Sequence, residues 1–358
     1  MKKAIFLIVS FVVLFLVSPV YAQEEVSYRG VINEYREIPC SEMFQENYKC
    51  FEYFVDIQEL DEEEVISPVL SENGESKFKK GDKVYVSSLS DEYGNEEWSI
   101  TGYNRNSSIL ILVFCFSVLA IIIGGKQGMR SLISLLLTVL ILYIWAIPRI
   151  LAGSDVISTG LFAVFVMIIV IMYTSYGFNI KSHIGIVSCI VGILIVAIFV
   201  KLFGGLVDIN GSGSEEAFLL FSQTEGSIDL LDVFFIGVLI GSVGVLDDVI
   251  MSQISSIFEL YKTDSTLNGF DLYKKAMIIG KDHLSSMINT LFLAYAGSSL
   301  ATVMLLTYNS SEMGNILQMD FIAEEIVRSL TASMGLLLIV PISSIIAAKI
   351  IPITLSKK

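Results

Sequence analysis

The sequence predicts an α-helical polytopic membrane protein, with about seven transmembrane helices after a signal peptide and a small N-terminal extracytoplasmic β domain. Of the 358 residues, 54% are hydrophobic and only 17% are charged, whereas soluble domains carry about 25% charged residues. Several apolar runs also approach the roughly 20 residues that span a bilayer. This composition excludes a cytosolic enzyme, a coiled coil and a disordered scaffold. The net charge of −14 argues against nucleic-acid binding.

The first 22 residues have the organisation of a signal peptide. Lys2 and Lys3 form a positively charged start, residues 4–17 are apolar, and residues 20–22 read Val-Tyr-Ala, a small-residue cleavage site. An uncleaved signal anchor is the alternative. Both interpretations place the following residues outside the cytoplasm.

Residues 23–106 form the predicted exported domain, which is strongly acidic. They contain 20 acidic and 8 basic residues, a net charge of −12. Phe51, Tyr53, Val55 and Ile57 alternate at period two, and turn residues separate further short runs, which predicts four or five strands in a small β-barrel or β-sandwich. The acidic run at 61–64 is interpreted as a solvated loop rather than a cation site.

The four cysteines divide between the two parts of the chain. Cys40 and Cys50 flank a polar segment of the exported domain, where a hairpin-closing disulfide is expected in an oxidising compartment, with two free thiols as the alternative. Cys115 and Cys189 lie in apolar runs and are interpreted as buried small hydrophobes. The sequence has no C-x-x-C pair, so it predicts no metal site or redox motif.

Residues 107–358 form the predicted transmembrane domain. The apolar runs are residues 108–125, 129–148, 156–175, 184–205, 231–258, 284–308 and 329–353. With the acidic domain outside, three positive charges fall in outside loops, namely Arg149, Lys201 and Arg328. Ten fall inside, namely Lys126, Arg130, Lys181, Lys262, Lys274, Lys275, Lys281, Lys349, Lys357 and Lys358. The positive-inside rule therefore places the C-terminus in the cytoplasm.

The fifth apolar run carries a polar stripe. At about 28 residues it is too long for one perpendicular span, so it must tilt, break or project from the bilayer. Spacings of three and four place seven residues on one helical face, namely Gly237, Gly241, Gly244, Asp248, Ser252, Ser255 and Glu259. The three glycines are expected to permit close helix packing. Asp247 is expected to point about 100° away from this face.

The sixth run offers a partner for that stripe. Asp282, Ser286 and Asn289 share a helical face, and Thr290 follows. Antiparallel neighbours would bring Asp248 to the depth of Asn289. A carboxylate inside a bilayer costs at least ~2.5 kcal/mol and normally faces a partner or a wet cavity. Asp248 is therefore the leading substrate-path candidate, and a polar helix interface with Asp248 bonded to Asn289 is an equally weighted alternative.

The same residues resemble a known family. Residues 241–260 read GSVGVLDDVIMSQISSIFEL and residues 280–300 read GKDHLSSMINTLFLAYAGSSL. Both segments are similar to signatures of the YibE/F family of bacterial membrane proteins, and residues 324–341 resemble its last span. The resemblance covers roughly residues 107–353. It implies a multi-pass protein of the bacterial cell membrane, with the family's acidic and polar positions falling on Asp248, Asp282, Asn289 and Thr290. The chain departs from the family pattern at Ser285, Ser286 and Ala301.

These observations favour a transporter or permease for an unknown small solute or ion, with a polar path between the fifth and sixth transmembrane helices. The expected surroundings are the lipid bilayer and a second copy or another membrane protein, with no cofactor. The alternatives are a non-catalytic scaffold whose exported domain binds an extracellular partner, and an intramembrane aspartyl hydrolase that uses Asp248 and Asp282. The sequence contains no Walker A loop, Gly-x-Ser-x-Gly elbow or His-Glu-x-x-His motif, so no enzyme activity is predicted.

Overall fold

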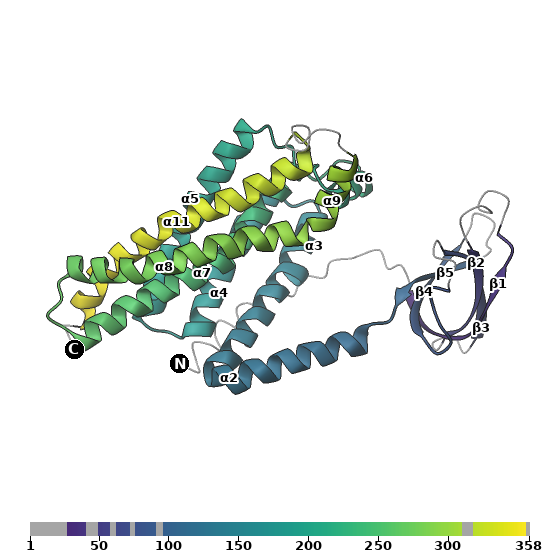
Figure 1. Cartoon of the computed structure of the whole chain (residues 1–358), viewed down its shortest axis with the longest axis horizontal. Coiled ribbons are helices and arrows are strands. Elements are labelled where there is room, and N and C mark those ends of the chain that lie inside the picture. The colour runs from purple at the N-terminus through teal and green to yellow at the C-terminus, as the bar shows by residue number, and fades with distance from the viewer. Residues whose placement is uncertain are drawn as a thin grey trace. The chain divides into compact units, whose positions relative to one another are not determined.

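The chain forms two compact units, which separate between residues 119 and 120 (Figure 1). The computed structural model describes residues 27–40, 49–57, 62–71, 76–90, 96–309 and 318–355. The predicted signal peptide lies outside the described residues. The last strand ends at Tyr103, and the first helix begins at Asn106.

The N-terminal unit holds a five-stranded antiparallel sheet, which forms a small half-barrel. The strand order is β3-β2-β1-β4-β5. The strands are β1 (Ser27–Ile38), β2 (Lys49–Ile57), β3 (Glu62–Ser71), β4 (Lys83–Ser90) and β5 (Glu96–Tyr103). The prediction of a small N-terminal β domain with four or five strands is confirmed. The expected solvated loop at the acidic run is wrong in part, because the glutamates at 62–64 begin β3 and pair with residues 55–57 of β2.

The half-barrel core follows the predicted alternation. Phe51, Tyr53, Val55 and Ile57 are all buried on β2, and the Tyr53 ring meets Phe78 edge to face with centroids 5.5 Å apart. Burying such side chains stabilises the fold by about 1.5–3 kcal/mol each. Cys40, which follows β1, is joined to Cys50 of β2 by a disulfide.

The second part of the chain is helical. Its elements are α2 (Asn106–Leu140), the π-helical turn η2 (Ile141–Ala146), α3 (Ile147–Leu151), α4 (Val156–Tyr176), α5 (Ile180–Leu206), α6 (Glu215–Gln223), α7 (Leu230–Thr263), α8 (Gly269–Ser298), α9 (Leu300–Asn309) and α11 (Asp320–Leu355). Inside α2, Gly125 has φ 55° and ψ −131°, which breaks the helical path. Glycine suits this position because it has no Cβ to clash at positive φ.

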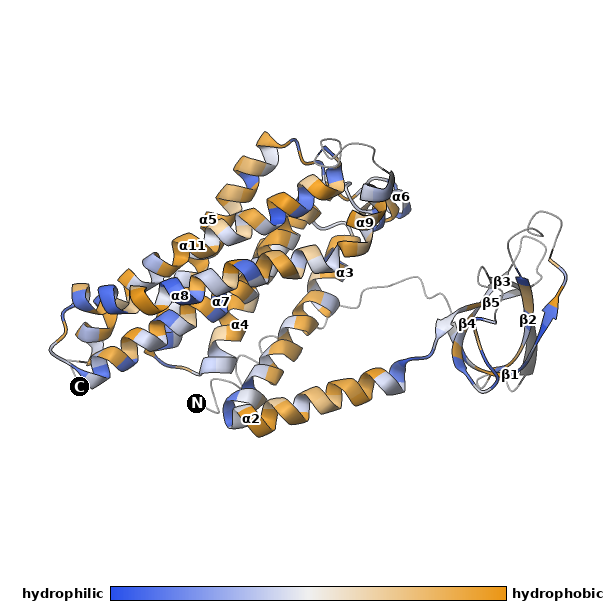
Figure 2. Ribbon diagram, viewed as in Figure 1, coloured by the Kyte–Doolittle hydropathy of each residue, from blue (hydrophilic) through white to orange (hydrophobic). Residues whose placement is uncertain are grey.

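Five helical segments among the described residues are long and apolar enough to cross a membrane. They are Asn106–Leu151, Val156–Tyr176, Ile180–Leu206, Leu230–Thr263 and Asp320–Leu355. Figure 2 shows hydrophobic residues along their lengths. These helices fit a membrane-embedded protein. The count of seven stays a prediction, since the first segment contains two of the expected runs and α8 and α9 are not among the five.

Helices α4, α5, α7 and α11 share one apolar core. Glycines let the backbones approach closely where the helices cross: a methyl group at Gly160 would overlap Ile236, one at Gly192 would press on Leu246, and one at Gly335 would overlap Val196. Such small residues are typical of close contacts between membrane helices. Helix α8 packs against both α11 and α7, so the polar residues of α7 and α8 belong to one packed assembly.

Candidate functional site

The stripe on α7 lies along a face that the apolar core does not cover. Gly241, Gly244 and Asp248 are exposed, and Ser252 and Ser255 are half-buried. A methyl group at Gly244 would meet no atom within 4 Å, whereas one at Gly241 would lie 3.3 Å from the Tyr295 hydroxyl. One at Gly237 would approach only Arg328, at 3.9 Å.

The open space beside Gly244 does not match the helix-packing role expected of it, whereas Gly241 lies close to Tyr295 of α8 and Gly237 lies near Arg328 of α11. The tight helix contacts of the apolar core fall at other glycines, including Gly192 and Gly335. The physical reason is the phase of the helix: the stripe is opposite to the side that buries Leu246 and Ile250. Among the stripe glycines, Gly244 is the one that leaves open space beside α7.

Where α7 approaches its C-terminal end, the stripe opens into a groove against α8. This groove has a volume of about 600 Å³. Its polar walls are Ser252, Ser255, Ser256, Glu259, Thr263, Asp264 and Lys275. Both predicted serines of the path thus lie in one groove, together with a lysine contributed by α8.

Where α7 begins, the stripe meets a group of polar side chains from α8 and α11, here called the charged cluster and defined as Glu325, Arg328 and Tyr295. The Arg328 Nε lies 3.6 Å from Glu325 Oε1, and both side chains are about one quarter exposed. Arg328 also stacks over the Phe234 ring of α7 at 5.2 Å. The enclosed atoms Glu325 Oε2 and Arg328 Nε make no hydrogen bond in the described part of the chain.

The charged cluster was not predicted as part of the site. The last apolar run in the sequence begins at residue 329, so the charges before it were assigned to an outside loop. In the structure α11 begins at Asp320 and carries them within a candidate span. Its Glu324 is 6% exposed and accepts a hydrogen bond of 2.9 Å from the Gly213 backbone N–H. The helical spacing of the apolar run continues before residue 329, and this signal could have placed the charges on the same helix.

The predicted residues of α8 are all solvent-exposed in the isolated chain: Asp282, Ser286, Asn289 and Thr290. Thr290 donates to the Ser286 carbonyl oxygen at 3.0 Å, within its own helix. The alternative hydrogen bond between Asp248 and Asn289 is not formed, and across the described residues neither side chain has a hydrogen-bond partner. The two polar faces are therefore not joined into a closed interface.

Asp247, next to Asp248, faces the interior of the helical unit and not the stripe. It interacts with Tyr176 of α4 and with Asp248, and the Cys189 thiol of α5 lies within its electrostatic range. Its Oδ1 atom is enclosed and has no hydrogen-bond partner within the described ranges. Helical spacing places Asp247 off the stripe and predicts no role for it. Its helical neighbours Val243, Ile250 and Met251 are buried apolar residues, so an acid on the apolar face is the signal that marks it.

A discontinuity lies beside the charged cluster. The long fifth run forms one continuous helix, α7, through 34 residues. The break falls instead at Ser299, where α8 ends and α9 begins, and the Ser299 N–H bonds back to the Tyr295 carbonyl at 3.2 Å. Interrupted helices next to polar residues are typical of transporter binding sites.

Among the described residues, no group of three or more His, Cys, Asp or Glu side chains is placed to hold a metal ion. A family model described as YibE/F-like protein matches residues 112–353. No curated protein and no solved structure matches the chain.

Proposed function

We propose that this chain, which belongs to the YibE/F-like protein family, is a membrane permease for a small solute or ion. The proposed path follows the stripe face of α7, between α7 and α8. It begins at the charged cluster, passes Gly244 and Asp248, and ends in the groove lined by Ser252 and Ser255.

One observation carries this proposal: the stripe is polar from Asp248 onward and has open space beside Gly244. From Gly237 to Ser255 it rises about 27 Å, at about 1.5 Å per residue. This length approaches the ~30 Å hydrocarbon thickness of a bilayer. A face of this length with space beside Gly244 and a groove at its end suits a passage better than a packing seam.

The charges along the face support the same function. Ionisable groups within membrane spans are costly and normally face a partner or a water-filled cavity. Among the described residues Asp248 has no hydrogen-bond partner, and two enclosed atoms of the charged cluster make no hydrogen bond. A scaffold that needs only to anchor its exported domain has no use for these groups.

Filling the space beside Gly244 is expected to block the path. Gly244→Leu should abolish activity while leaving abundance and the thermal unfolding midpoint close to wild type, because the new side chain enters open space. Gly244→Ala, which adds one methyl group, should have a smaller effect. The measurement is growth of a deletion strain with a clear phenotype, complemented by each variant, alongside immunoblotting of the membrane fraction.

Gly205→Leu provides the matched control. Gly205 ends α5, away from the stripe, and a methyl group there also meets nothing within 4 Å. It should keep full activity. Wild-type growth with Gly244→Leu at normal abundance would contradict the proposed path, and so would equal inactivation by Gly205→Leu.

A further inference from the structure

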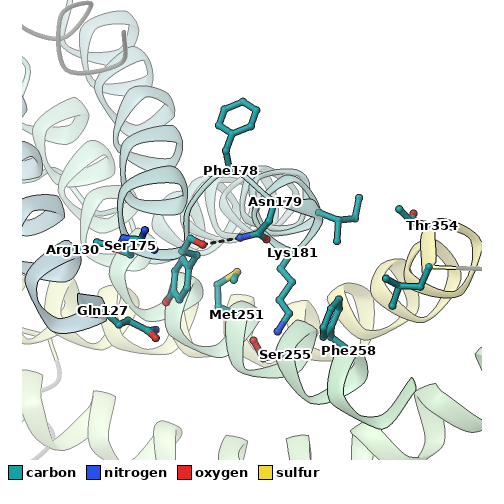
Figure 3. Close-up of a pocket in the computed structure, with 13 residues that line it drawn as sticks. Gln127, Arg130, Ser175, Phe178, Asn179, Lys181, Met251, Ser255, Phe258 and Thr354 are labelled. Atoms are coloured by element: carbon teal, nitrogen blue, oxygen red, sulfur yellow. Dashed lines mark hydrogen bonds between the residues drawn. The ribbon is translucent and has the colours of Figure 1, made fainter. Parts of the chain in front are cut away.

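A second cavity lies where α4 ends and α5 begins, and Ser255 is the one stripe residue in its lining. Its volume is about 540 Å³, within the range of about 300–1,000 Å³ that is common for small-molecule sites. Helix α2 contributes Gln127 and Arg130, α5 contributes Lys181, and α7 contributes Ser255 and Phe258. Figure 3 shows Lys181 extending toward Ser255, with Arg130 and Gln127 on the other side of the cavity.

The cavity is positively charged. Its lining includes Arg130 and Lys181 but no carboxylate. Arg130 is half-buried and pairs with no acid in the described part of the chain. Asp247 interacts with Tyr176 of the cavity wall but is not itself part of the lining.

Lys181 is held in place without being neutralised. Its Nζ lies 4.1 Å from the centroid of the Phe258 ring, which restricts the side chain through a cation–π contact. Its one acidic neighbour in the described residues is Glu259, with Nζ 3.8 Å from Oε1, and the Glu259 side chain is 62% exposed. Water screens this exposed carboxylate, so it offsets only part of the charge of Lys181.

We propose that this cavity binds a phosphate-bearing anion, with Arg130 and Lys181 as its charge partners and Ser255 and Gln127 as hydrogen-bond donors. The planar guanidinium of arginine matches two phosphate oxygens at once. Ile180 and Lys181, in the first turn of α5, line the cavity, so the positive end of the helix dipole lies at its wall. None of these residues has a role in the permease path except Ser255, which lines both cavities.

Two sources supply this chemistry. One is the headgroup of an anionic phospholipid, since basic pockets between membrane helices bind such headgroups on the cytoplasmic side, the side to which the positive-inside rule assigns Arg130 and Lys181. The other is a soluble phosphate compound. Both require the same two cations, so one set of variants tests the site and the added ligand identifies the source.

The test uses the purified full chain, delipidated in a neutral detergent. Its thermal unfolding midpoint is recorded against phosphatidylglycerol, phosphatidylcholine and inorganic phosphate at constant ionic strength. We expect a rise of several degrees with phosphatidylglycerol or with phosphate, and a smaller or no rise with phosphatidylcholine. A rise with the lipid alone assigns a headgroup, and a rise with inorganic phosphate assigns a soluble ligand.

Variants connect this stabilisation to the cavity. Arg130→Gln and Lys181→Gln should raise the anion concentration for half-maximal stabilisation at least tenfold. Arg130→Lys should change this concentration much less, because it keeps the positive charge. Lys201→Gln, at the far end of α5, should leave it unchanged. The proposal is overturned if the wild-type chain gains no stability from either anion, or gains as much from phosphatidylcholine as from phosphatidylglycerol. It is also overturned if Lys201→Gln weakens the stabilisation as much as the cavity variants do. Should the glutamine variants fail to fold, the wild-type measurement alone decides the question.

Discussion

Asp248→Asn is expected to reduce activity about tenfold or more, because each tenfold in rate corresponds to about 1.4 kcal/mol, the scale of one lost charge interaction. Asparagine keeps the size and hydrogen-bonding capacity of the side chain but removes its charge and titratable proton. Since Asp248 is exposed and bonds to no side chain among the described residues, abundance and thermal stability should stay near wild type. Complementation of a deletion phenotype, or an uptake assay once the solute is known, measures the effect.

Asp247→Asn is the matched control for this prediction. Asp247 carries the same side chain one position away, but it faces Tyr176 and the interior of the helical unit. Burying a neutral amide costs less than burying a carboxylate, so the variant should fold at least as well as wild type and retain activity. If Asp248→Asn behaves like wild type, or if Asp247→Asn proves the more harmful to activity, the helical face assigned to the path is wrong.

Arg328→Met is expected to give the largest loss of stability. Removing the arginine leaves Glu325 charged within a candidate span, with its enclosed Oε2 unpaired. Breaking a fully buried ion pair costs about 3–5 kcal/mol, and we expect about 2–3 kcal/mol here because both side chains are about one quarter exposed. The measurement is the unfolding midpoint of the purified chain in detergent.

The double variant Glu325→Gln with Arg328→Met separates charge from packing. It removes both charges, so most of the lost stability should return. If the charged cluster also forms the entrance of the path, the double variant should be stable yet inactive. A double variant as unstable as Arg328→Met would contradict the ion-pair explanation and assign the loss to the packing of Arg328 on Phe234.

The parts of the fold that were predictable are those with a local periodic pattern of apolar residues. Alternation at Phe51, Tyr53, Val55 and Ile57 is a local signal, and these residues form the core of the half-barrel as expected. The start of α11 was missed because hydropathy marks only the apolar part of a helix, and a segment that carries Asp320, Glu324, Glu325 and Arg328 reads like a loop. The surroundings of Gly244 were missed for another reason: a glycine stripe has the same sequence whether a neighbouring helix fills it or leaves it open.

The part of the candidate site that was predictable depends on spacing within one helix. The phase of α7 separates Asp247 from Asp248, and spacing alone gave that separation correctly. Spacing did not show which acid the interior of the unit would enclose, because this depends on how α4 and α5 pack against α7. Arg328 could not be connected with Phe234 and Tyr295, since that contact joins three helices distant in the sequence.

If the stripe face of α7 lines a permeation path, water must reach it, and cysteine accessibility in native membranes measures this. Single cysteines are placed at Gly244 and Ser252, and for comparison at Leu194 and Ile198, which are exposed on α5, in a chain whose Cys115 and Cys189 are replaced by serine. The thiolate is the form of cysteine that attacks a thiol reagent, and it forms in water and not in lipid. We predict that a water-soluble reagent labels Gly244→Cys and Ser252→Cys but not Leu194→Cys or Ile198→Cys. Labelling at Gly244→Cys as low as at Leu194→Cys would show that the stripe faces lipid and would contradict the permease path.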